Sequence, residues 1–213
     1  MTDPAVPAIS RSLFLYAVLY GGMTCIAGVL GNKQIDLGPL AVESGIFAFL
    51  QLVVLSSAVA ELHGRATANR LVLFGFVPLI MSMALILLVL ALPAADEMDP
   101  ARLGAFHLVL GQSPRLMAGG LIAYGISQML NVTIFSALRR GEGRLLWLRA
   151  SVASVTSQVI DTVIFITIAF YGVFPIGTLM AGHMLAKVLL SVTLVPPLIY
   201  LLVGLGRRLD AKA

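Results

Sequence analysis

The stretch from Arg149 to Tyr171 is long and apolar enough to cross a bilayer, yet it carries a carboxylate, Asp161, at its centre. At about 1.5 Å per residue from Ser151, Asp161 would lie roughly 15 Å deep, near the middle of a hydrocarbon core about 30 Å thick. A charge at that depth is costly, so an intramembrane acid usually marks a functional site. Gln158, three positions earlier, shares its helical face. We expect this polar face to turn toward other helices or water.

A similar polar signature occurs thirty residues earlier. Residues 127–135 match residues 157–165 at Ser, Gln, the Asn/Asp position, Ile and Phe. An apolar sequence of low complexity can produce such a match by chance, but paired polar helices that meet at a site are typical of transporters built from related segments. We therefore expect the two helices to contribute polar side chains to one central cavity: Gln128, Asn131, Ser157 and Gln158.

The composition predicts a membrane protein over the whole chain. Of its 213 residues, 59% are hydrophobic and 11% are charged, which leaves no stretch for a soluble domain. Because open strands are excluded from lipid, the fold class predicted is all-α, a single domain over residues 1–213 surrounded by the bilayer. Six apolar segments are long enough to span, at about residues 13–31, 44–61, 70–92, 116–138, 151–171 and 177–204.

The basic residues indicate how these segments are oriented. With both termini on one side of the membrane, ten Lys and Arg residues fall on that side and three on the other, which predicts cytoplasmic termini. Basic residues at helix ends orient the chain, so we expect no nucleic-acid partner. The single cysteine, Cys25, lies inside the first apolar run, which we interpret as a retained helix. The sequence suggests no metal, cofactor or catalytic residue, and it leaves a homo-oligomer open.

A second intramembrane charge, Lys187, is expected to meet Asp161. The connection at residues 172–177 is short, so the helices around it should be antiparallel neighbours. Asp161 lies eleven residues before this connection and Lys187 ten residues after it, which places them at nearly equal depth. The pair could fix only the register of the helices, or it could border a solvated cavity. Tyr124 and the amides on neighbouring helices favour the cavity.

Glu61 is a further candidate for the site, at the inner mouth of the second segment. It could contribute a carboxylate there, or it could pair with Arg65 one helical turn later. Both interpretations place it near the cytoplasmic surface.

Several of these stretches resemble motifs of the VUT family of queuosine-precursor transporters. The similarity covers residues 45–64, 124–128 and 146–162, together with Lys187 and residues 197–200. It implies a six-helix inner-membrane protein that takes up 7-cyano-7-deazaguanine or its aminomethyl relative, precursors of the modified tRNA base queuosine. The residues are chemically compatible with such a ligand: Asp161 could accept from its N–H groups and Lys187 or an amide could donate to its carbonyl. An aromatic ring could stack on it: Tyr124, Phe135 or Phe165.

The chain departs from the family at two polar positions. The family generally carries acids where this chain has Ser57 and Asn131. A hydroxyl and an amide keep hydrogen-bonding capacity, but they cannot cancel a cationic group at neutral pH. The loss of these two acids argues against a cationic substrate and against a proton-coupled step.

Two other classes of protein fit parts of the pattern. A substrate-binding subunit of an energy-coupling-factor transporter also has about six helices and would bind a vitamin-like or purine-like molecule, but it would need ATPase partners, since this chain has no P-loop. An intramembrane serine hydrolase would need Ser127 or Ser157 beside His183. Neither serine lies in the Gly-x-Ser-Gly context. We therefore expect a transporter rather than an enzyme.

Overall fold

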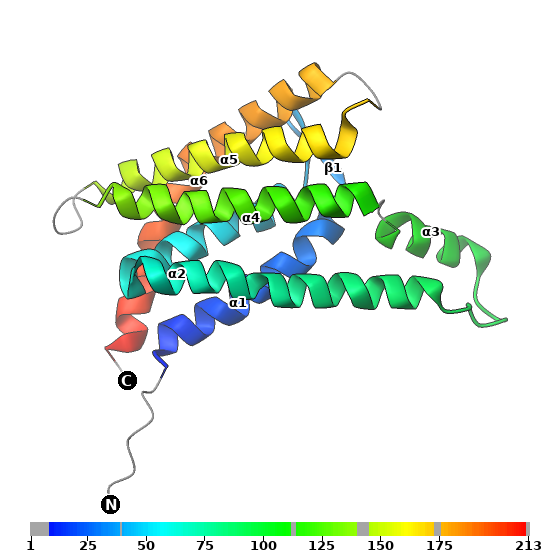
Figure 1. The fold of residues 1–213 in the computed structure, drawn as a ribbon, viewed down its shortest axis with the longest axis horizontal. Helices are drawn as coiled ribbons and strands as arrows, with labels where there is room; N and C mark the ends of the chain where they lie inside the picture. The colour runs from blue at the N-terminus through cyan, green and yellow to red at the C-terminus, as the bar shows by residue number, and fades with distance from the viewer. Residues whose placement is uncertain (1–8, 39, 112–113, 140–144, 173–175, 212–213) are drawn as a thin grey trace, which may run out of the picture.

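The computed structural model describes residues 9–38, 40–111, 114–139, 145–172 and 176–211. Five helices in this part of the chain are long and apolar enough to cross a membrane. Figure 1 shows them running side by side as a bundle. The elements in chain order are α1 (Arg11–Leu30), β1 (Gln34–Leu37), β2 (Leu40–Glu43), α2 (Ile46–Ala91), α3 (Pro100–Leu110), α4 (Pro114–Ala137), α5 (Leu146–Phe170) and α6 (Ile176–Asp210).

Helix α2 contains both the second and the third predicted segments. Its 46 residues would extend for about 69 Å if straight, more than twice the roughly 30 Å of a hydrocarbon core. It bends at Gly64, whose φ of 83° and ψ of 163° are not helical and suit a residue without a Cβ. Figure 1 shows the chain doubling back there. The connection expected between residues 61 and 70 is therefore shorter than predicted, because helix continues on both sides of the bend at Gly64.

A short β-hairpin was not expected from an all-α prediction. Strands β1 and β2 pair antiparallel, with Gln34 opposite Glu43 and Leu37 opposite Leu40. The backbone N–H of Ser44 then donates to the Lys33 carbonyl at 2.8 Å, which extends the pairing by one step. Strand β2 packs against α6. The hairpin thus holds Glu43 against the end of the helical bundle.

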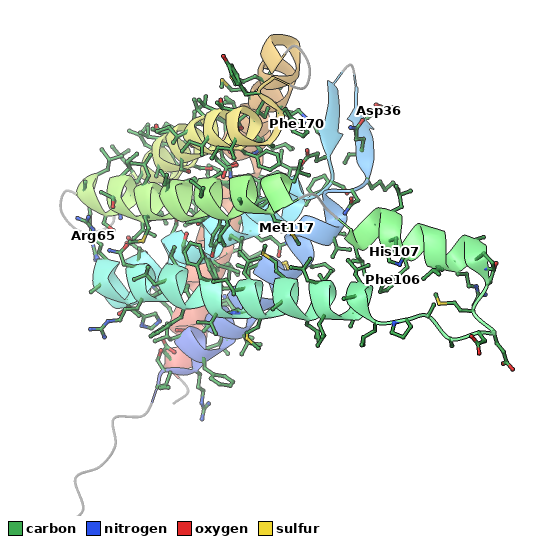
Figure 2. All side chains as sticks on the ribbon, turned by 45° about the vertical axis from the view of Figure 1, so that its right-hand side comes forward. Asp36, Arg65, Phe106, His107, Met117 and Phe170 are labelled. Atoms are coloured by element: carbon green, nitrogen blue, oxygen red, sulfur yellow. The ribbon has the colours of Figure 1, made fainter. Side chains whose placement is uncertain are left out.

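The bundle has two distinct ends. We call the end with β1 and β2 the hairpin end, and the end with Arg11, Gly64 and Asp210 the termini end. In Figure 2, Asp36 of the hairpin and Arg65, next to the bend, are labelled at opposite ends. Large apolar side chains point outward between these ends, among them Phe74 and Leu85, which are 69% and 60% exposed. Such a surface suits contact with lipid rather than with water.

At the termini end, α1 is tied to both α2 and α6. The Ser12 backbone N–H and hydroxyl donate to the two carboxylate oxygens of Asp210, at 3.0 and 2.7 Å. The Ser12 oxygen also lies 2.8 Å from Nε2 of His63, directly before the bend. Ser12 is fully buried. Three elements distant in the sequence therefore meet at one serine.

Candidate functional site: a buried charged pair beside two cavities

Asp161 and Lys187 form a direct ion pair between α5 and α6. The Lys187 ammonium donates to Oδ2 of Asp161 at 2.7 Å, and the Ser127 hydroxyl on α4 donates to Oδ1 at 3.0 Å. Asp161 is 6% exposed and Lys187 9% exposed. The contact predicted from their equal depth is thus confirmed. Each oxygen accepts one described hydrogen bond, so the carboxylate keeps lone pairs for another donor.

The pair does not lie at the centre of its helix. Helix α5 begins at Leu146, five residues before the predicted start. Asp161 is therefore about 22 Å from the first residue of α5 and about 13 Å from the last. It lies nearer the hairpin end than the termini end.

A cavity of about 50 Å³ borders this pair. A larger cavity of about 160 Å³ lies beside it, between α1, α2, α3 and α4 at the hairpin end. Tyr124 lines the larger cavity, and its hydroxyl donates to that of Tyr20 at 2.9 Å. The smaller cavity is lined by Asp161, Lys187, His183, Glu43, Phe49 and Phe165, among others. Both charges of the pair and an aromatic ring thus face one hollow space.

Glu43 is a site residue that sequence reasoning missed. It lines both cavities, and burial raises the pKa of its carboxyl, an effect that Lys187 opposes and Asp161 reinforces. In the described residues, no hydrogen bond or ion pair reaches this carboxylate. The apolar pattern offered no signal for it, because Glu43 precedes the second segment and reaches the site only through the hairpin.

The two amides of α4 belong to a separate buried cluster. The Asn131 amide donates to the hydroxyls of Ser57 and Ser56, at 3.1 and 3.2 Å, and the Ser56 hydroxyl donates to the Gln128 carbonyl at 3.3 Å. Neither amide lines the two cavities. The two positions at which the family resemblance expects acids, 57 and 131, are therefore in contact with each other. A role for Gln128 and Asn131 in binding stays a prediction.

Gln158 and Ser157 are buried on α5, one turn before Asp161. The Ser157 hydroxyl donates to the Ser154 carbonyl at 3.0 Å, within its own helix. Gln158 is 3% exposed, and its side-chain oxygen has no hydrogen-bond partner in the described part of the chain. Neither residue lines the two cavities, so a role for Ser157 and Gln158 in binding stays a prediction.

Glu61 lies away from both cavities, in an ion pair with Arg149. The Arg149 guanidinium donates to Oε2 of Glu61 at 2.9 Å, and both side chains are 4% exposed. The interpretation that Glu61 pairs with Arg65 is wrong, because Arg65 donates to Thr133 instead. Phe135, expected as a ring for the ligand, lies 4.3 Å from the Arg149 guanidinium carbon. Sequence spacing could not find this pair, because its members are 88 positions apart.

The arrangement needed by a serine hydrolase is not formed. Ser127 donates to Asp161 and Ser157 to a backbone carbonyl, and neither has a hydrogen bond to His183 within the described residues. His183 faces the smaller cavity instead.

Comparison with known proteins supports a transporter. Residues 43–202, more than half of the chain, match the family described as "Putative vitamin uptake transporter". A Bacillus subtilis (strain 168) protein named "Probable queuosine precursor transporter" is 31% identical over 161 residues, which cover 74% of this chain and 69% of the relative. No solved structure matches the chain. Apolar helices of spanning length agree with a place in a membrane. The chain is therefore a membrane protein that belongs to the vitamin uptake transporter (VUT) family.

Proposed function

We propose that the protein imports a queuosine precursor, 7-cyano-7-deazaguanine or a related deazapurine, across the bacterial inner membrane. The name of the Bacillus subtilis relative supports the substrate class. The observation that carries the proposal is the buried Asp161–Lys187 pair, because both of its charges line a cavity. Arg149 of the other described buried pair also lines a cavity, of about 270 Å³, but its partner Glu61 does not. Asp161 and Lys187 offer both of their charges to the same hollow space.

The groups at this cavity suit a deazaguanine. Its pairing edge presents N–H donors next to a carbonyl acceptor, and Asp161 can accept from the former while Lys187 donates to the latter. Phe49 and Phe165 offer faces for the ring at the cavity wall.

The proposal includes six membrane spans in one domain, with both termini in the cytoplasm. The two arms of α2, residues 46–63 and 65–91, each count as one span because the chain reverses at Gly64. Ten basic residues belong to the termini side against three on the other. Arg149 is buried against Glu61, which leaves nine against three and keeps the asymmetry.

Uptake by charge variants tests the binding role. The single variants Asp161→Asn and Lys187→Met and the double variant should be expressed in bacteria that lack their own uptake of the precursor. Each single variant strands a buried charge, so its folding suffers, whereas the double variant removes both charges and should accumulate in the membrane normally. It should nevertheless fail to take up labelled 7-cyano-7-deazaguanine.

The matched control is the double variant Glu61→Gln with Arg149→Met. It also removes a buried ion pair, but one that lies outside both cavities. We expect it to retain uptake. Full uptake by the Asp161/Lys187 double variant would refute the binding role.

A further inference from the structure

The two cavities share one wall at the hairpin end. Four residues from four elements line both: Glu43, Phe49, Gly120 and Phe165. We call this set the neck. The larger cavity reaches to Asn32 and Val109, near the ends of α1 and α3, whereas the smaller one reaches Asp161 and Lys187. A ligand that enters from the hairpin end therefore meets the neck before it meets the ion pair.

Glu43 is the ionisable residue of this neck, and it has no partner of its own. Asp161 and Lys187 satisfy each other at 2.7 Å, but no described hydrogen bond or ion pair reaches the Glu43 carboxylate. The Lys187 ammonium lies 5.9 Å from the Phe49 ring centroid, and no other Lys or Arg is among the described residues that line the smaller cavity. The ammonium group thus pairs with Asp161 and not with Glu43, although both carboxylates line the same cavity. A partly buried acid without a partner is stabilised by a ligand that brings an N–H donor or a positive charge.

We propose that Glu43 selects ligands by charge at the neck, admitting neutral N–H donors and cations to the Asp161–Lys187 pair and excluding anions. This role of Glu43 rests on the proposed function only for the identity of the ligand. It also supplies an acid that can balance a cationic group, which the chain lacks at Ser57 and Asn131.

Gly120 makes the charge of the neck measurable without a substrate. A Cβ built on Gly120 meets no atom within 4 Å, although the glycine lines both cavities. A cysteine at this position therefore places its thiol in the neck without displacing the fold. The native Cys25 lines the larger cavity and should first be replaced by serine, which keeps a donor for the Pro78 carbonyl.

The experiment compares two methanethiosulfonate reagents of similar size, one bearing a trimethylammonium group and one a sulfonate. They react with purified Cys25→Ser, Gly120→Cys protein. The reaction is run at pH 8 so that the Glu43 carboxylate is ionised, since burial raises the pKa of this group. Each rate is first divided by the rate of the same reagent with a small free thiol. On this scale the cationic reagent should react about tenfold faster than the anionic one. Adding Glu43→Gln should abolish this preference, while Glu43→Asp should preserve it.

Gly104→Cys is the matched control, because Gly104 also has open space for a Cβ but lies on α3 outside both cavities. Its reagent preference should not respond to Glu43→Gln. Equal rates at Gly120→Cys, or a preference that survives Glu43→Gln, would overturn the role of Glu43. If neither reagent reaches Gly120→Cys, the passage through the neck is itself refuted.

Competition for uptake then connects the neck to the ligand. Three 7-deazaguanines that differ only at position 7, as aminomethyl, cyano and carboxylate, should compete with labelled ligand in the wild type, with the carboxylate weakest by about tenfold. Glu43→Gln should remove this disadvantage. If the protein transports no deazaguanine, the proposed function fails while the thiol reactions still decide the role of Glu43.

Discussion

Replacing Arg149 with methionine should destabilise the protein strongly, whereas replacing Glu61 as well should restore much of the loss. The guanidinium joins three helices: it donates to Glu61 on α2 at 2.9 Å, donates from Nε to the Phe135 carbonyl on α4 at 3.2 Å, and lies over the Phe135 ring. Arg149 itself lies near the start of α5. Methionine keeps the apolar stem but leaves the Glu61 carboxylate buried without a counter-charge.

The expected magnitudes follow from these contacts. Breaking a buried ion pair by removing one partner costs about 3–5 kcal/mol. A change of 1 kcal/mol shifts the melting temperature of a protein of this size by about 2–4 °C, so Arg149→Met should melt about 6–20 °C lower. In the double variant Glu61→Gln with Arg149→Met the stranded charge is gone. What remains lost is one hydrogen bond of about 1 kcal/mol and a cation–π contact of about 0.5–2 kcal/mol.

Thermal melting in detergent, with the loss of monodisperse protein as the readout, is measured for the wild type, the two single variants and the double variant. The coupling between positions 61 and 149 should be about 2 kcal/mol or more. Arg149→Lys should recover only part of the stability, because an ammonium group cannot reach Glu61 and the Phe135 carbonyl with one rigid fork. A melting temperature for Arg149→Met equal to that of the wild type would refute the reasoning.

Two further predictions concern packing and orientation. Gly75→Ala should lower the melting temperature by about 2–12 °C, because the new Cβ would lie 2.6 Å from Tyr20 and 2.8 Å from the Tyr124 hydroxyl, while Gly22→Ala, with no atom within 4 Å, should not. An equal effect of both substitutions would contradict this packing. An alkaline phosphatase fused after α6 should be inactive in cells, whereas the same enzyme inserted at Gly38 of the hairpin should be active; the reverse pattern would invert the proposed orientation.

The sequence predicted the long helices and the ion pair because both depend on simple distances along the chain. Hydropathy locates a span to within a few residues, and the short connection after Tyr171 brings Asp161 and Lys187 to equal depth. The hairpin was not predicted because each strand has only four residues, and the second, Leu40–Glu43, does not alternate between polar and apolar residues. Glu43 was missed together with the hairpin, since hydropathy does not predict where a residue just outside a span lies relative to the site.

The repeated polar signature shows why a motif does not place side chains. Ser127 reaches Asp161, whereas Gln128, which was expected to face a central cavity, accepts from Ser56. Adjacent residues point about 100° apart around a helix, so a match between two segments fixes their order and not the direction in which each side chain faces. The rotation of α4 is set by its contacts with α2 and α5. Those contacts depend on the whole bundle.

The hydrogen bonds of Ser12 with Asp210 also set an order of assembly. The two residues are 198 positions apart, so at about 5–20 residues per second roughly 10–40 s of synthesis separate them. During that interval α1 can pack against α2, which directly follows the hairpin, but its first turn has no carboxylate to bind. The last turn of α6 therefore completes the first turn of α1. The contact between these two helix ends can therefore form only after all the other described helices have been synthesised.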